Sequence, residues 1–384
     1  MRSYDGSAMP TELPCGAAAP HRNDTMTLNA HWNTGGSPCN VSVTELRGFI
    51  VRAVRSCGMQ PGPAETFCDV LTRATLRGVG HHDVHDLPLR LQALSSREVN
   101  ADPQIRAIGG LGALAAYDGD NGPGELCASF AMARACALAE EFGIGLCTIR
   151  ASNHFLSAAP YVEWAAERGF LAVVLSRNKP SMALPGSTRK TIGNMPFGFA
   201  SPTGQGQPLL LDACLAYASY GSLAARAAAD QPVPATWGSD ASGTPSTDPR
   251  TIIEHGFPSP IGGHKGLGLA MLCELLTSGL AAGCVLGERN PRYPNGRGIH
   301  GQTAIAIRTQ ALHLERSYLD RVDALTAGLG AIGSPVRLPG SVSLTAKRRA
   351  LDAGALVLKT GVLDELDAWA VRLGVQPLRR SAPA

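Results

Sequence analysis

The sequence predicts an α/β fold on three observations. Between residues 124 and 213, segments with helical spacing of apolar residues alternate with short runs that are apolar throughout. Gly143 and Gly169 follow two of the predicted helices, where a residue in the left-handed conformation commonly ends a helix. The chain of 384 residues is 44% hydrophobic, which is enough for one large or two ordinary cores.

The expected elements follow in chain order. Residues 1–40 are rich in Pro, Gly, Asn, Thr and Ala without any period, so we expect a disordered N-terminal extension, with Met26 an alternative start. Helices are expected at 41–58, where Ser42 or Thr44 can cap, and at 63–78, 125–143 and 161–169. Strands are expected at 144–152, 170–176, 197–201 and 208–213. After these come a polar functional loop or exposed arm (229–262), an apolar helix (267–283), a strand (303–309) and two or three terminal helices.

Composition excludes several classes of protein. The net charge of +3 comes without a basic cluster, so nucleic acid is not an expected partner. Ten cysteines without a CxxC pair indicate neither a disulfide framework nor a zinc ribbon. No run of about 18 apolar residues and no signal peptide are present, which predicts a soluble cytoplasmic protein without a membrane partner.

A glycine-rich turn at 260–272, PIGGHKGLGLAML, precedes the apolar helix. Glycines allow backbone N–H groups to approach an anion, while the helix N-terminus and Lys265 add positive charge. The run therefore predicts a pyrophosphate cradle formed by Gly263, His264, Lys265 and Gly266. It fits neither the GxGxxG nor the P-loop pattern, and a plain glycine turn is the alternative.

A histidine-rich loop at 77–88, RGVGHHDVHDLP, is either a metal site, a catalytic loop or a polar turn. His81 and His85 have the spacing of metal ligands on a helix, but the glycines before them and the proline after them favour a loop that enters a helix, so no metal is predicted. Asp86 can be a substrate contact or simply an N-cap.

Two further segments place polar residues at strand ends. In SNHFLSAAP, His154 follows a strand, where α/β proteins bind ligands, although a structural histidine is the alternative. In DGDNGPGE, Asn121 can bind a ligand or only stabilise the turn. Asp212 ends an apolar strand, so we expect it to be paired with a cation or a histidine.

These motifs together resemble the malate/L-lactate/sulfolactate dehydrogenase family, which includes ureidoglycolate dehydrogenase and piperideine/pyrroline-2-carboxylate reductases. The resemblance extends from about Val41 to the last helix. It is carried by the histidine loop and by DGDNGPG, SNHF, PSMA, GNMP, LLLDA, PSTDP, GGHKGLG and RLPG. It implies a non-Rossmann α/β fold with a mixed, largely antiparallel sheet flanked by helices, and a homodimer. It also implies hydride exchange between NAD or NADP and a 2-oxo acid or cyclic ketimine.

The resemblance also implies domains and roles. We expect a helical, dimerisation and catalytic-loop lobe (41–118 with 261–384) and a cofactor-binding domain (119–260). His82 would give or take the proton, supported by Asp212 and by His81. The expected cofactor contacts are Asn121, His154, Phe155, Ser157, Gly263, His264, Lys265 and Gly266. The expected substrate contacts are Asp86, Met182 and Asn194.

The histidine loop departs from the family pattern S-H-G-x-x-R-x-P at three positions. His81, Asp83 and Asp86 stand at the serine, glycine and arginine positions. Because an arginine that binds a carboxylate is replaced by an aspartate, we expect a substrate other than a simple 2-oxo acid, and Arg90, Arg177 or Lys179 can supply another anion site. The alternatives are a redox-inactive relative with isomerase or lyase chemistry, and a catalytically silent subunit.

Overall fold

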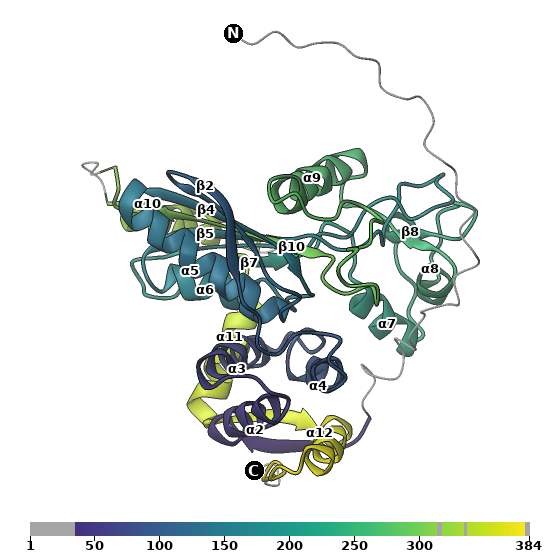
Figure 1. Ribbon diagram of the computed structural model, residues 1–384. Coiled ribbons are helices and arrows are strands. Elements are labelled where there is room, and N and C mark those ends of the chain that lie inside the picture. Colours follow the sequence, from purple (N-terminus) through teal and green to yellow (C-terminus); the bar gives the residue numbers. More distant parts are fainter. Residues whose placement is uncertain (1–34, 313–316, 334–335, 381–384) are drawn as a thin grey trace.

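The computed structural model describes residues 35–312, 317–333 and 336–380 (Figure 1). Most of the expected N-terminal extension lies outside these residues. Its last residues do not, because Pro38–Ser42 forms strand β1, which pairs antiparallel with β11 (Ala355–Lys359). The expected boundary at residue 40 is therefore wrong. A strand whose partner lies more than 300 residues away leaves no local pattern.

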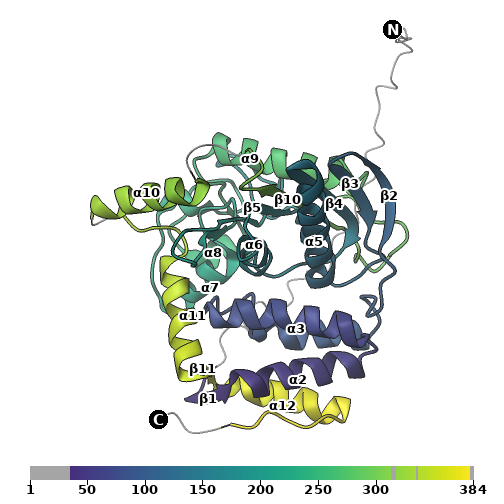
Figure 2. The same cartoon turned by 90° about the vertical axis from the view of Figure 1, so that its left-hand side faces the viewer.

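A small helical lobe surrounds this two-stranded sheet, at the bottom of both views (Figures 1 and 2). It contains α2 (Val43–Ser56), α3 (Pro61–Leu76), α4 (Leu87–Ser95) and α12 (Thr360–Leu373). The Ser42 hydroxyl accepts a hydrogen bond from the Glu45 amide at 3.1 Å, as an N-cap should. One buried apolar cluster joins these elements and includes Phe49, Phe67, Leu91 and Leu366.

A seven-stranded sheet forms the larger part of the molecule, in the order β2-β3-β4-β10-β5-β6-β7. Only β3 and β4 run parallel, which confirms the expected mixed, largely antiparallel sheet. The strands are β2 (Arg106–Leu111), β3 (Leu114–Asp118), β4 (Ile144–Ser152), β5 (Phe170–Ser176), β6 (Phe197–Ser201), β7 (Leu209–Ala213) and β10 (His300–Arg308). The sheet thus contains strands from both of the expected domains.

Helices cover both faces of this sheet (Figure 1). On one face lie α5 (Gly124–Phe142) and α6 (Ala159–Ala166), packed on an alanine-rich core. On the other lies α9 (His264–Glu274), followed by a π-helical turn (Leu275–Gly279). The three terminal helices are α10 (Tyr318–Ala331), α11 (Ser341–Ala353) and α12. No helix in the described ranges is long and apolar enough to span a bilayer.

The polar stretch 229–262, expected as a functional loop or an exposed arm, contains short elements of its own. It contains β8 (Gly238–Ser239), α8 (Pro249–Glu254) and β9 (Phe257–Pro258), which pack beside α7 (Tyr220–Ala228). A small core of Ala218, Leu223, Val233 and Ile252 holds this unit together. Its apolar residues are too widely spaced along the chain to produce a period.

The chain segments that carry the candidate site meet at one end of the strands of the large sheet. The registers pair Asp118 with Arg150, Ser152 with His300, and Ser176 with Gln302. Phe197 likewise pairs with both Leu175 and Ala213. The carboxyl ends of β3, β4, β5 and β7 therefore meet the amino ends of β6 and β10, and residues far apart in the sequence become neighbours.

Candidate active site

The loop between α3 and α4 is held in shape by Asp83. One carboxylate oxygen accepts hydrogen bonds from the backbone N–H and the Nδ1 of His85, at 3.0 and 2.6 Å, and the other accepts from the Gly80 amide at 2.8 Å. Burial alone would raise the pKa of Asp83, but its bonds with His85 outweigh burial and lower it. The residue at the family's glycine position thus stabilises the loop.

Asp86 is buried just before α4, but its side chain makes no capping hydrogen bond to that helix. The capping interpretation of Asp86 is therefore wrong, and Asp83 is the aspartate that caps, at the single turn Val84–Asp86. Burial lowers the pKa of His81 and Asp86 opposes part of that shift, whereas Asp86 adds to the effects of Asp83 and Glu125 that outweigh burial and raise the pKa values of His85 and Arg90. A buried carboxyl group thus stands at the position where the family has an arginine.

His82 is oriented by a backbone carbonyl. Its Nδ1 lies 3.1 Å from the Leu156 oxygen, in the segment between β4 and α6. Because a carbonyl only accepts hydrogen bonds, Nδ1 must carry a hydrogen, and Nε2 of the neutral ring keeps its lone pair. Burial lowers the pKa of His82, with the Leu156 bond acting in the opposite direction. Near neutral pH His82 is therefore a neutral base with a defined accepting atom.

Asp212 does not take the expected role of direct partner to a histidine or cation. Its carboxylate accepts a hydrogen bond from the Ala159 amide at 3.0 Å, where α6 begins. Burial raises the pKa of Asp212, and the amides of Ala159 and Ala158 offset part of the rise. The end of β7 meets the N-terminus of α6, whose unpaired N–H groups satisfy the carboxylate. Within the described residues, no hydrogen bond joins Asp212 to His82.

Four histidines form a row at this end of the strands. Ring centroids lie 4.5 Å apart between His81 and His82, 5.0 Å between His82 and His154, and 6.0 Å between His154 and His300. The His154 Nδ1 accepts from the Leu156 amide at 3.1 Å and from Arg90 at 3.0 Å, so its hydrogen is on Nε2. Burial, together with smaller effects of nearby histidines and basic side chains, lowers the pKa of His154 well below its usual value and that of His300 to about 3.

Arg90 and Glu125 lie beneath this row as an ion pair, with Arg90 Nε 2.8 Å from Glu125 Oε1. Burial raises the pKa of Glu125 and Arg90 counteracts the rise. Glu125 and His300 are not among the residues expected from the sequence. The signals that could have indicated them are a charged residue in the first turn of an apolar helix and a histidine at the start of an apolar strand.

The glycine turn before α9 fits the approach of an anion. Gly262 and Gly263 have φ of +61° and +64°, and a Cβ built on Gly263 meets no atom within 4 Å. At Gly266 a Cβ would lie 2.1 Å from the Ile261 carbonyl, so this position requires glycine. His264 and Lys265 are exposed beside the turn. Backbone bonds from Ile261 to Leu215 and from Leu215 to Asn194 place the turn next to the site.

Several expected contacts have structural partners. Phe155 is fully buried and stacks on Tyr161 at 5.2 Å, and Met182 is buried in a core cluster, whereas Ser157 is buried beside Asp212. The Asn194 side chain accepts a hydrogen bond from Asn178 at 3.1 Å. No group of histidine, cysteine or acidic side chains in the described part of the chain is arranged to hold a metal ion.

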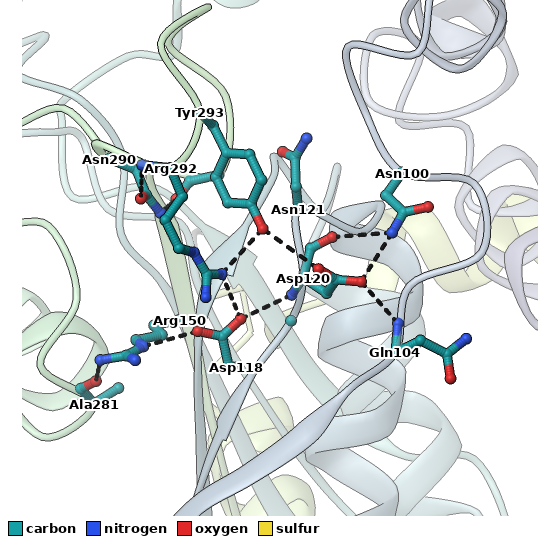
Figure 3. Close-up of polar contacts among 12 residues, drawn as sticks. Asn100, Gln104, Asp118, Asp120, Asn121, Arg150, Ala281, Asn290, Arg292 and Tyr293 are labelled. Carbon is teal, nitrogen blue, oxygen red and sulfur yellow. Dashed lines mark hydrogen bonds and ion pairs between the residues drawn. The ribbon is translucent and has the colours of Figure 1, made fainter.

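Asn121 belongs to a polar network that closes the DGDN turn. Its side chain donates to the Glu98 carbonyl at 2.8 Å and accepts from Asn153 at 3.0 Å. Figure 3 shows the neighbouring contacts, in which Arg150 and Arg292 reach Asp118, and Tyr293 points to Asp120. The structure therefore uses the Asn121 side chain to hold the turn that leads into α5.

Comparisons with known proteins identify the family of the chain. The malate/L-lactate dehydrogenase family model matches residues 41–367. The chain is 32% identical over 335 residues to a (2R)-3-sulfolactate dehydrogenase (NADP(+)) of Chromohalobacter salexigens, covering 86% of this chain and 98% of the relative.

Two solved structures share the fold. Sulfolactate dehydrogenase from Methanocaldococcus jannaschii has a TM-score of 0.80 at 25% identity, over 88% of this chain and 98% of that one. Delta1-piperideine-2-carboxylate reductase from Pseudomonas syringae has a TM-score of 0.79 at 26% identity, over 86% and 99%. With its histidine loop, mixed sheet and glycine turn in place, this chain belongs to the malate/L-lactate dehydrogenase family.

Proposed function

We propose that the protein transfers a hydride between NAD or NADP and the C=O or cyclic C=N carbon of a small substrate, with His82 as the proton donor and acceptor. Membership of the family makes it an NAD(P)-dependent dehydrogenase or reductase of small substrates. The observation that carries the proposal is the bond from His82 Nδ1 to the Leu156 carbonyl, which leaves Nε2 as the reactive atom.

His82 has a definite task in each direction. In oxidation, neutral Nε2 accepts the proton of the substrate hydroxyl or amine. In reduction, the protonated ring donates from Nε2 to the oxygen or nitrogen that gains electrons. A bound nicotinamide supplies or accepts the hydride in this reaction. Because burial lowers the pKa of His82, the resting ring is the base that oxidation needs.

Two other histidines support a neutral, oriented site. His154 directs an N–H from Nε2, since Arg90 and the Leu156 amide occupy its Nδ1. That N–H is a fixed donor which can bind a substrate oxygen or the cofactor. His81 is held by the Val79 carbonyl at 3.0 Å and lies edge-on to His82. The geometry supports His81 as a positioning residue that packs against the acid-base ring.

The glycine turn is the proposed anchor for the cofactor phosphates. Gly263 keeps the backbone approachable, Gly266 allows the turn to pack closely on Ile261, and His264 and Lys265 provide polar side chains at the start of α9. Substrate choice is proposed to differ from that of simple 2-oxo acids. The buried Asp86 repels a carboxylate at the position where the family arginine would bind one.

A homodimer is part of the proposal. The outer surface of α9 and the turn that follows it exposes Leu269, Met271, Leu272, Leu275 and Leu280, each at 49% or more of its full area. A large apolar patch on one helix is typical of a protein-protein interface. A second copy of this chain is the proposed partner.

The experiment compares His82→Asn with the wild type in a screen of NADH and NADPH oxidation over 2-oxo acids, neutral ketones and cyclic imines. Asparagine can still donate to the Leu156 carbonyl but cannot exchange a proton. We expect kcat to fall about 10²- to 10⁴-fold, with little change in NAD(P)H affinity. His255→Asn, at an exposed histidine remote from the row, is the matched control. Undiminished turnover by His82→Asn would remove His82 from the mechanism.

A further inference from the structure

The loss of the family arginine raises the question of which residue binds the acidic group of a substrate. Two of the three basic candidates are already engaged. Arg177 is fully buried, with Nε 3.3 Å from Glu274 and Nη1 2.6 Å from the Ile299 carbonyl. Arg90 is bound to Glu125 and His154. Both guanidinium groups therefore hold parts of the protein together.

Lys179 is different, because its side chain is exposed. Its backbone N–H donates to Asn178 Oδ1 at 2.9 Å, and the same oxygen lies 3.4 Å from Nε2 of His300. The Lys179 backbone thus contacts the same side-chain oxygen as the last ring of the histidine row. Across the ranges that the structure describes, its ammonium group forms neither a hydrogen bond nor an ion pair. It is a positive charge next to the site that no acidic side chain neutralises.

Lys190 adds to this charge from the same loop. It is exposed, and burial of part of its side chain together with Lys179 lowers the pKa of its ammonium group. An anion that binds between or beside the two lysines stabilises the charged form of Lys190 that Lys179 disfavours. The positive charge around this loop also acts on His300. Burial is the largest cause of its lowered pKa, and Arg177, Arg90, Lys179 and Arg297 all contribute to the same shift.

The row of histidines therefore runs from an acidic end to a basic end. After burial, Asp83 and Asp86 act on His81 at one end, and Arg177, Arg90, Lys179 and Arg297 act on His300 at the other. Arg90 also acts on His82 and His154, which lie between these ends. A substrate whose reacting carbon lies at His82 meets repulsion for an anion on the Asp86 side and attraction on the Lys179 side. The polarity of the site is the reverse of that expected from an arginine at position 86.

We propose that Lys179, with Lys190 beside it, binds the acidic group of the substrate on the side of the site opposite Asp86. The inference rests on the proposed function and assigns a specificity-determining residue to it. The substrate class is a ketone, imine or alcohol that carries a carboxylate or a similar oxyanion directed toward His300. Lysine binds such a group as a point charge, so the site tolerates more than one anion geometry.

The experiment measures binding of two anionic probes, oxamate and tartronate, and one neutral probe, pyruvamide, to the protein saturated with NADH or NADPH. Isothermal titration is done for the wild type, Lys179→Met, Lys179→Arg and the control Lys359→Met, a lysine exposed on β11. Lys179→Met should weaken binding of the anions about 10-fold or more and leave pyruvamide unchanged. Lys179→Arg should stay within about threefold of the wild type, since the charge is kept.

Three outcomes overturn the inference. Equal affinity of the wild type and Lys179→Met for the anions removes Lys179 from substrate binding, and failure of the wild-type complex to bind either anion does the same. A loss confined to NADH or NADPH affinity assigns Lys179 to the cofactor instead. The proposed function fails separately, if the wild type binds neither nicotinamide and oxidises neither in the substrate screen.

Discussion

His300 should make the protein less stable in mild acid, and His300→Phe should remove that effect. The pKa of His300 is lowered to about 3, from 6.5 in the unfolded chain, because the ring is buried among basic groups. Between pH 7.5 and 4.5 the folded protein keeps His300 neutral while the unfolded chain binds a proton there. Protonation therefore favours the unfolded state as the pH falls below 6.5.

The size of the effect follows from linkage. Each pH unit below 6.5 costs 1.36 kcal/mol for one such group, so this histidine should remove roughly 2.7 kcal/mol of stability by pH 4.5. The folded pKa lies far enough below 4.5 that its exact value hardly changes this figure. Phenylalanine keeps a ring of similar size but does not titrate. Any packing cost of the substitution is the same at every pH and cancels in the comparison.

Urea unfolding of both proteins at pH 7.5, 6.5, 5.5 and 4.5 measures the difference. The gap between wild type and His300→Phe should change in favour of the variant by roughly 1.4 kcal/mol at pH 5.5 and 2.7 kcal/mol at pH 4.5. Parallel stability curves from pH 7.5 to 4.5 would show that His300 titrates normally. The claim that His300 stays neutral in the folded protein over this pH range would then be wrong.

Three further predictions concern the turn, the base and the interface. Gly266→Ala should destabilise the protein by about 1–3 kcal/mol, because the new Cβ would lie 2.1 Å from the Ile261 carbonyl, whereas Gly268→Ala has open space and should be nearly neutral in thermal unfolding. In the oxidation direction kcat/KM should stay level from pH 6.5 to 8.5 and decline only in acid, since the pKa of His82 is lowered; a decline that begins above pH 7 would contradict this. Leu272→Glu should shift the mass measured by light scattering from dimer to monomer, and an unchanged mass would place the interface elsewhere.

Much of the fold was predictable because its signals are local. The strands at 144–152, 170–176 and 197–201 coincide with β4, β5 and β6, since buried strands appear as short apolar runs bounded by glycine or polar residues. The hairpin of β2 and β3 was missed, because β2 is exposed along its whole length and contains two glycines. Strand β11 was missed because it is only five residues long between two helices.

The site was predictable in its residue types but not in its pairings. His154 was correctly predicted to follow a strand and Asp212 to end one, and both lie at the same end of the strands of the large sheet. The hydrogen-bond partner of His82 is the Leu156 carbonyl, and that of Asp212 is the Ala159 amide. Such bonds cannot be predicted from the sequence, because every residue has a backbone carbonyl and nearly every residue has a backbone N–H. The aspartate at position 83, where the family has a glycine, has a structural role that the sequence did not indicate: it accepts hydrogen bonds from Gly80 and His85 and holds the loop in shape.

The position of β10 in the centre of the sheet has a consequence for synthesis of the chain. β10 joins β4 to β5, yet it is translated about 130 residues after β5. A nascent chain that ends before residue 300 can make the two halves of the sheet but has no strand to connect them. Histidines at both ends of the row can then come together only after nearly four fifths of the polypeptide has been made. The large sheet, and with it the candidate active site, can therefore be completed only after β10 has been synthesised.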